Sequence, residues 1–439
     1  MKMLNKYFCA AALLLLASCK HETAPKPLSH GTADFSTYIA VGNSLTAGYS
    51  NGGLTLASQL VSYPNIVAGQ METVGGGAFA QPLFSASQAN GSGYLELDGF
   101  NADGVSTTQM VTTDLAVRGT ISIAGYGNVT LYTKYTGAIN NFGVPNIKLR
   151  DITNPNYGNI NGFFERLLPG NAPNNTTTYL NFITQKPFTF FSNWLGNNDA
   201  FAYALAGGSS DTLTDKTTFS LLYNQLITKL TASGQKGVVA TIPDVTIIPY
   251  FNTITVSSIL TVLKRANPSV SGIYINALNS ESISGTYHAR LATTQDLITL
   301  TFNPAKIGQM VATSNGQQPY GLSPYAPIEN QYVLDANEVL LIKDYINSYN
   351  QTIKVAAAAK GLALYDAYAF FNQITYEGLL INGETLDSDY ISGGIFSLDG
   401  VHLTARGYAA NANQIINAIN STYGSTIPTV DVLSYKGLN

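Results

Sequence analysis

The chain has 439 residues, and 45% of them are hydrophobic, which is enough to bury the core of one large domain or of two smaller ones. Only 11% are Asp, Glu, Lys or Arg, against roughly 25% in an average soluble domain, so uncharged polar residues must cover much of the surface. The net charge is −4 and the sequence has no Lys/Arg cluster, so we expect no nucleic acid partner.

The first segment has the pattern of a secretory signal. An apolar run over 7–17 follows two lysines, but it is shorter than the roughly 20 residues that span a bilayer. Leu16-Ala17-Ser18-Cys19 resembles a bacterial lipobox, which implies cleavage before Cys19 and acylation of its thiol and new amino terminus. The alternative is an ordinary secretory peptide with a chance cysteine. We therefore expect a lipoprotein signal peptide over 1–18 and an extracytoplasmic protein anchored to a membrane through Cys19, in the periplasm or on the cell surface.

The segments around the main domain carry no evident chemistry. Residues 19–33 contain Pro and Gly without an apolar period, which is typical of a flexible tether. Because Cys9 and Cys19 are the only cysteines, a mature chain that starts at Cys19 forms no internal disulfide. We expect one main domain over 34–425 and a carboxyl-terminal tail over 426–439.

Within that domain, strand patterns alternate with helix patterns. The predicted strands are 35–41, 188–194, 238–242 and 362–365, and the predicted helices are 63–71, 200–206, 219–230, 335–360 and 405–419. This alternation predicts an α/β fold with a parallel sheet covered on both faces, in which functional groups gather at the carboxyl ends of strands. Ser44 and Asn198 both follow predicted strands.

Two stretches depart from this alternation and are expected to be insertions. The first, at about 72–135, contains alternating residues around Gly125 and Gly127 that predict a β-hairpin. The second, at about 252–332, is rich in Pro, Gly and Tyr, and we expect it to contribute to a substrate surface.

The few histidines narrow the search for a catalytic base. His21 and His30 fall in the expected tether, and His288 has no carboxylate within three residues, which favours a surface or packing role. His402 follows Asp399 by three residues in a turn before the last helix. That spacing lets Asp399 accept the Nδ1 proton and leaves Nε2 as a base for a serine nucleophile.

The order of Ser44, Asp399 and His402 matches neither chymotrypsin nor subtilisin, and Gly42-x-Ser44-x-Thr46 lacks the second Gly of an α/β-hydrolase elbow. Three blocks instead resemble the SGNH hydrolases, also called the GDSL esterase/lipase family: Val41-Gly42-Asn43-Ser44-Leu45-Thr46, Gly196-Asn197-Asn198-Asp199 and Asp399-Gly400-Val401-His402. The resemblance implies a three-layer α/β/α flavodoxin-like domain. It implies Ser44 as nucleophile, His402 as base, Asp399 as its partner and Asn198 as an oxyanion donor.

Two positions depart from that family's pattern. Asn43 stands where the family has the Asp of its Gly-Asp-Ser-Leu motif, but that Asp is not the triad carboxylate. In the SGNH family, a further sequence block supplies a backbone N–H that completes the oxyanion hole. Residues 140–146 match this block best, and they offer Gly143 and Asn146 as donors. Asn tolerates positive φ better than most residues. The glycines at 75–77 are a competing candidate.

The sequence thus predicts a serine ester hydrolase of esterase or lipase type that forms an acyl-serine intermediate. Its substrate is expected to be an ester-bearing small molecule, a lipid or an acetylated glycan, the last making it a carbohydrate deacetylase. No metal-binding or nucleotide-binding motif occurs, so we expect no cofactor. The alternatives are a glycan-binding surface lipoprotein that keeps the fold without activity, and a general extracellular scaffold. In both, Ser44, Asn198 and the Asp399/His402 pair would be turn and helix-capping residues.

Overall fold

The structure is a computed structural model that describes residues 27–100, 106–282 and 285–438. The expected signal peptide, the lipidation site Cys19 and the first part of the expected tether lie outside these residues. Within the described ranges, no helix combines the length and the apolar character that a membrane crossing requires.

The centre of the molecule is a parallel β-sheet. Its strands are β1 (Tyr38–Gly42), β6 (Asn141–Gly143), β7 (Phe190–Trp194), β8 (Lys236–Ala240) and β15 (Ala363–Tyr365). They lie in the order β6-β1-β7-β8-β15, and every neighbouring pair is parallel. Counted along the chain, this order is 2-1-3-4-5, the flavodoxin-like arrangement of a doubly wound sheet. The predicted fold class is confirmed.

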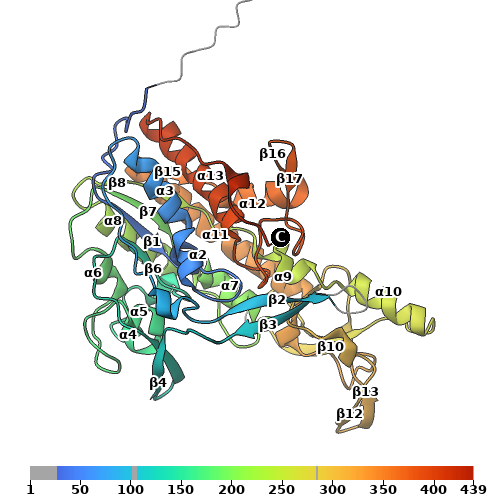
Figure 1. Cartoon of the computed structure of the whole chain (residues 1–439). Coiled ribbons are helices and arrows are strands. Elements are labelled where there is room, and N and C mark those ends of the chain that lie inside the picture. The colour runs from blue at the N-terminus through green and yellow to red at the C-terminus, as the bar shows by residue number, and fades with distance from the viewer. Residues whose placement is uncertain (1–26, 101–105, 283–284, 439) are drawn as a thin grey trace, which may run out of the picture.

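Helices cover both faces of the sheet (Figure 1). On one face, α3 (Tyr63–Glu72) packs against α13 (Ala405–Tyr423), and on the other α8 (Lys216–Leu230) packs against α11 (Ala336–Lys360). Because both faces are covered, all residues of β1 and β7 are buried. The long helices α11 and α13 stop at the left-handed glycines Gly361 and Gly424.

Shorter elements complete the layers and join them. They are α1 (Ser44–Ala47), α2 (Leu56–Leu60), α4 (Tyr157–Ile160), α5 (Gly162–Glu165), α6 (Tyr179–Ile183), α7 (Asn198–Leu205), α9 (Pro249–Asn252) and α12 (Ala367–Tyr376), with the hairpin of β16 (Leu379–Ile381) and β17 (Glu384–Leu386).

The first insertion forms two β-hairpins. The predicted hairpin is present as β4 (Val117–Ile123) and β5 (Gly127–Tyr132). A second hairpin, β2 (Tyr94–Phe100) with β3 (Ser106–Val111), was not predicted. It runs across the molecule toward the second insertion (Figure 1).

The second insertion is more regular than its sequence indicates. It contains α10 (Val256–Ala266) and the strands β9 (Tyr274–Leu278), β10 (Tyr287–Leu291), β11 (Leu297–Ile298), β12 (Met310–Thr313), β13 (Gly316–Pro319) and β14 (Val333–Leu334). Ile273, Ile275, Ile298 and Ile328 are fully buried in an apolar core of its own. The region forms a lobe that projects from the sheet domain (Figure 1).

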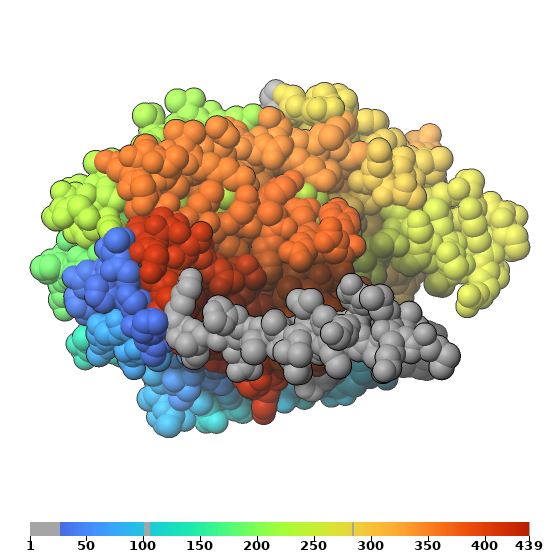
Figure 2. All heavy atoms as spheres, turned by 90° about the horizontal axis from the view of Figure 1, so that it is seen from above, coloured from blue at the N-terminus to red at the C-terminus, as the bar shows by residue number. Residues whose placement is uncertain are grey.

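Both ends of the described chain lie along α13. The backbone of Thr32 donates to the carbonyl of Tyr423 at 2.9 Å, and that of Thr426 donates to Ser29 at 2.8 Å. The amino-terminal residues lie beside the carboxyl-terminal helix (Figure 2). Part of the expected tether, residues 27–33, thus lies against the sheet domain in this structure. The tail also packs on α13, where the backbone of Val430 pairs with the side chain of Asn413.

Candidate active site

Ser44 lies at the carboxyl end of β1, where the chain turns directly into α1. The side-chain oxygen of Asn43 accepts from the backbone of Leu45 at 3.1 Å and caps this short helix. A Cβ at Gly42 would lie 1.9 Å from the hydroxyl of Thr46, so the turn requires Gly there. The N–H of Ser44 belongs to the first helical turn, where a backbone donor has no acceptor within the helix.

His402 joins Ser44 to Asp399. Its Nε2 lies 2.9 Å from the Ser44 hydroxyl, and its Nδ1 lies 2.8 Å from Asp399 Oδ2. The turn that carries the pair depends on Gly400, which has φ +69 and sits so close to Tyr250 that a Cβ would lie 2.9 Å from its backbone nitrogen. The structure thus brings together the three residues that the sequence singled out as a triad.

The carboxylate of Asp399 is held by several other donors. Its Oδ1 accepts from the Ser397 hydroxyl and from the backbones of Val401 and His402, at 3.1, 2.9 and 2.8 Å. Its Oδ2 also accepts from the backbone of Gly52 at 2.7 Å. Burial acts to raise the pKa of Asp399, but His402 and these N–H groups outweigh it and hold the pKa well below its usual value. Asp399 is therefore an ionised carboxylate in a fixed orientation.

Tyr49 supports the imidazole ring from a third side. Its ring centroid lies 4.6 Å from that of His402, and its hydroxyl donates to the carbonyl of Gly52 at 2.7 Å. The buried Tyr408 in turn donates to the carbonyl of Tyr49 at 2.5 Å. Sequence reasoning missed Tyr49, Gly52 and Ser397. Of these three residues, only Ser397 could have been found from the sequence, because it lies two residues before the candidate carboxylate Asp399.

The candidate oxyanion donors come from the two strands that flank β1. In the sheet register, Gly42 pairs with Gly143 on β6 and with Trp194 on β7. Asn198, at the start of α7, and Asn146, just after β6, therefore lie at the same edge of the sheet as Ser44. This edge includes the switch point between β1 and β7, where doubly wound folds bind their ligands.

The loops after β6 and β7 contact each other directly. Asn198 Nδ2 donates to the carbonyl of Ile147 at 3.0 Å. Asn146 has the left-handed φ of +67 that its residue type tolerates, and its N–H has no acceptor among the described residues. The N–H of Gly143 already donates to the Asn141 side chain at 2.9 Å. Of Gly143 and Asn146, only Asn146 therefore has a free N–H donor among the described residues.

Asp199 fixes the relative position of these loops. It is completely buried and accepts from the backbone of Leu149 and from the Thr214 hydroxyl, both at 2.6 Å. Burial raises its pKa to about 6, although these donors act in the opposite direction. Asp199 thereby ties the start of α7 to the segment that follows Asn146.

The competing oxyanion candidate at 75–77 is wrong, because those glycines lie at the other end of the sheet. The N–H of Gly77 donates to the carbonyl of Phe35 at 3.0 Å, and Phe35 precedes β1. Gly76 donates to the carbonyl of Met71 at 2.8 Å. These glycines close the turn after α3.

The other histidines lie apart from this site. His288 is exposed on β10, and His30 bonds to the carbonyl of Ala33. Within the described ranges, no group of three or more His, Cys, Asp or Glu side chains is arranged to hold a metal ion.

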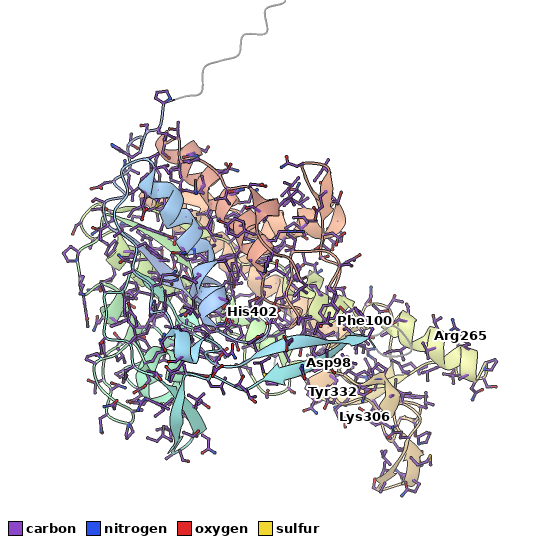
Figure 3. All side chains as sticks on the ribbon, in the orientation of Figure 1. Asp98, Phe100, Arg265, Lys306, Tyr332 and His402 are labelled. Carbon is purple, nitrogen blue, oxygen red and sulfur yellow. The ribbon has the colours of Figure 1, made fainter. Side chains whose placement is uncertain are left out.

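Figure 3 shows where His402 lies relative to the β2–β3 hairpin. His402 lies in the body of the molecule, whereas Asp98 and Phe100 lie toward the end of the hairpin.

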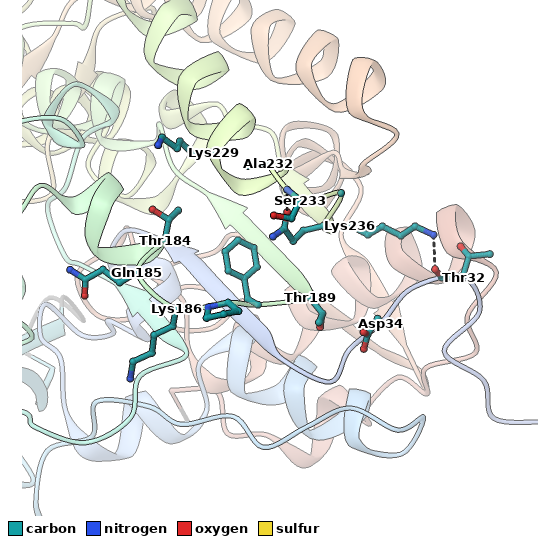
Figure 4. Close-up of a pocket in the computed structure, with 14 residues that line it drawn as sticks. Thr32, Asp34, Thr184, Gln185, Lys186, Thr189, Lys229, Ala232, Ser233 and Lys236 are labelled. Atoms are coloured by element: carbon teal, nitrogen blue, oxygen red, sulfur yellow. Dashed lines mark hydrogen bonds between the residues drawn. The ribbon is translucent and has the colours of Figure 1, made fainter.

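A cavity of about 720 Å³ lies away from the triad, at the amino ends of β7 and β8. It is lined by Thr32, Thr189 and Lys236, among others, and Lys236 donates to the carbonyl of Thr32 (Figure 4). It includes none of the candidate site residues.

No family model and no curated protein matches the chain. Its structural neighbours include an alpha/beta hydrolase enzyme, LAE5, from the metagenome of Lake Arreo, Spain, with 11% identity, a TM-score of 0.35 and coverage of 89% of this chain and 96% of that one. They also include an extracellular lipase from Streptomyces rimosus, with 12% identity, a TM-score of 0.31 and coverage of 88% and 98%. Likenesses this distant leave the function to be inferred from the site itself.

Proposed function

We propose that the protein is a serine ester hydrolase of the SGNH type, with Ser44 as nucleophile, His402 as general base and Asp399 as its orienting carboxylate. The observation that carries the proposal is the continuous chain of hydrogen bonds from the Ser44 hydroxyl through the imidazole to the Asp399 carboxylate, at 2.9 and 2.8 Å. In this geometry, His402 can take the proton of Ser44, and Asp399 holds His402 in the tautomer that leaves Nε2 free to accept that proton.

The reaction divides into two acyl transfers. His402 Nε2 takes the Ser44 proton as the hydroxyl oxygen attacks the ester carbonyl carbon, and a tetrahedral intermediate forms. The C–O bond to the alcohol then breaks, and His402 returns the proton to the leaving oxygen, which leaves an acyl-serine. Water repeats these steps, with His402 again as base, and releases the acid and free Ser44.

Three donors would hold the negative oxygen of each intermediate: the N–H groups of Ser44 and Asn146 and the side chain of Asn198. Asn198 Nδ2 carries two hydrogens, and the carbonyl of Ile147 takes one of them. The second is left for the oxyanion. Losing one such donor typically lowers turnover by about 100- to 1,000-fold.

The strand order and the placement of the three sequence blocks support the SGNH assignment. The block around Ser44 follows β1, the block around Asn198 follows β7, and the Asp399/His402 block precedes α13. Asn43 replaces the family's Asp, but its side-chain oxygen Oδ1 still caps α1. The substitution therefore removes a charge beside Ser44 and keeps the local turn.

We further propose that the enzyme works outside the cytoplasm, anchored through Cys19. The triad residue His402 lies just before α13, and the amino-terminal segment docks at the other end of that helix, against Tyr423 and Thr426. The 19 residues of α13 rise by about 28 Å. An anchor at Cys19 would hold the active site away from the membrane surface.

The test is hydrolysis of p-nitrophenyl acetate and longer p-nitrophenyl esters by the protein and by its Ser44→Ala variant. Turnover by the wild type and none by the variant would support the proposal, and the chain-length profile would separate an acetylesterase from a lipase. If both proteins were inert on every ester, a glycan-binding lipoprotein without activity would be the better account. Such a binder has no need of a hydrogen-bonded Ser–His–Asp chain.

A further inference from the structure

A cavity opens beside the two asparagines proposed as oxyanion donors. It has a volume of about 380 Å³, within the range of small-molecule sites, and both Asn146 and Asn198 line it. Its apolar wall consists of Tyr157, Ile160, Ala202 and Leu205, and its polar wall of Lys148, Arg150, Asp151 and Asp211. The cavity therefore adjoins the place where Asn146 and Asn198 would hold an ester carbonyl, and it offers room for a group attached to that carbonyl.

The polar wall is built from charges that pair with each other. Lys148 Nζ lies 2.6 Å from both oxygens of Asp211, and Arg150 donates to the same carboxylate at 3.1 Å. Arg150 also donates to the Thr212 hydroxyl at 2.8 Å. Burial acts to raise the pKa of Asp211, but Lys148, Thr212 and Arg150 together hold it below its usual value. The wall thus presents fixed donors and acceptors.

This arrangement discriminates between classes of ligand. A long alkyl chain would desolvate the charged groups without replacing their hydrogen bonds to water. A carboxylate or phosphate would have to compete with Asp211 for Lys148 and Arg150. Hydroxyl groups both donate and accept, so they can bind the carboxylate and the guanidinium while the ion pairs remain.

We infer that this cavity, here called the Arg150/Asp211 pocket, binds the hydroxyl-rich part of the substrate, and that the substrate is an ester of a neutral carbohydrate. The inference rests on the proposed ester hydrolase function and specifies its substrate class. The proposed anchor at Cys19 agrees with this substrate class, because His402 and the docked amino-terminal residues lie at opposite ends of α13, a helix that rises by about 28 Å. An ester of a membrane lipid would have to leave the bilayer to reach the active site.

The experiment measures binding separately from turnover. Binding of a partially acetylated xylo-oligosaccharide is followed by calorimetry on the Ser44→Ala protein, with and without Ala202→Trp. Ala202 is half-buried on α7 and lines the cavity, so Trp would fill the space without removing a hydrogen bond. Ala359→Trp, at an exposed position of α11, is the matched control. Asp211→Asn is a second variant that keeps the side chain's shape.

We expect Ala202→Trp and Asp211→Asn each to weaken binding at least about tenfold, and Ala359→Trp to leave it unchanged. In the Ser44-containing protein, Ala359→Trp should keep kcat/KM for p-nitrophenyl acetate within about threefold of the wild-type value, because this position on α11 lies outside the cavity. Equal binding by the Ala202→Trp and parent proteins, or no binding by the parent, would overturn the inference. If wild-type protein hydrolysed no ester while the binding pattern held, the proposed function would fail and the pocket assignment would stand.

Discussion

Replacing Asp399 with Asn should abolish most activity by fixing the wrong tautomer of His402. Three donors converge on Oδ1, from Ser397, Val401 and His402, so the amide oxygen of Asn would take that position. The NH₂ group would then stand at Oδ2 and donate to His402 Nδ1. The ring proton would move to Nε2, which faces the Ser44 hydroxyl at 2.9 Å and could no longer accept its proton.

The expected loss in kcat is about 10⁴-fold, equivalent to about 5.5 kcal/mol of transition-state stabilisation. The variant should also be less stable by about 1–3 kcal/mol, because the N–H of Gly52 would face an NH₂ group and lose its acceptor. The folded pKa of Asp399 lies below the ordinary 3.8, so its ionisation stabilises the wild type above that pH. The wild type loses this stabilisation by ionised Asp399 as the pH falls below 3.8, and the Asp399→Asn variant lacks it at every pH.

The assay is kcat and KM for p-nitrophenyl acetate, with urea denaturation of the same samples. Ser397→Ala is the matched control, since it removes one donor from Oδ1 and keeps the carboxylate and the tautomer. It should lose some stability and less than about tenfold in kcat. The reasoning is refuted if Asp399→Asn, correctly folded, keeps more than about a tenth of wild-type kcat near neutral pH.

Three more predictions follow from individual residues. Asn146→Gly should keep the wild-type kcat for esters, because Gly adopts a φ of +67 without strain. Asn146→Val should lower kcat about 100-fold, because Val disfavours that φ and would displace the donor N–H. Equal kcat values for the two variants would show that Asn146 is not part of the oxyanion hole. Gly400→Ala should lower the free energy of unfolding by about 1–3 kcal/mol, because Gly400 has a φ of +69 and a Cβ there would crowd the backbone of Tyr250. An unchanged midpoint in urea denaturation would contradict this. Burial and the neighbouring Asp335 raise the pKa of Glu338 from 4.5 to about 8, so stability should decline as the pH rises between these values, by up to about 1.4 kcal/mol per unit. Glu338→Gln should flatten that decline in urea denaturation at pH 5 and 8, and an equal decline in both proteins would count against the assignment.

The sheet, its main helices and the triad geometry could be anticipated from the sequence for physical reasons. The strand β1 is a continuous apolar run because both faces of a parallel sheet are covered. His402 stood out because histidines are few and a carboxylate lies three residues before it. The helix α11 begins with an Asp335/Glu338 capping box and ends at Gly361, and both signals are local.

The features that escaped prediction depend on distant contacts or on weak patterns. The strand β6 has three residues, too few for a period, and β2 and β3 are largely unburied, so they show little apolar alternation. The second lobe draws its core from isoleucines scattered over more than one element. The docking of Ser29 onto Thr426 joins residues 397 positions apart, which composition cannot reveal.

The choice among oxyanion candidates also needed the tertiary structure. Gly143 and Asn146 were both candidates on the sequence, but the N–H of Gly143 is taken by the side chain of Asn141. The glycines at 75–77 were excluded only because Gly77 pairs with Phe35, at the far end of β1.

The most direct test of the central claim is covalent labelling of Ser44. The protein is incubated with a fluorophosphonate, which phosphonylates a serine activated by a neighbouring base, and the adduct is located by mass spectrometry of peptides. We predict one adduct on Ser44, none in Ser44→Ala, and a strongly reduced rate in His402→Ala. An unlabelled wild-type protein, or labelling that persists in Ser44→Ala, would contradict the assignment of Ser44 as nucleophile.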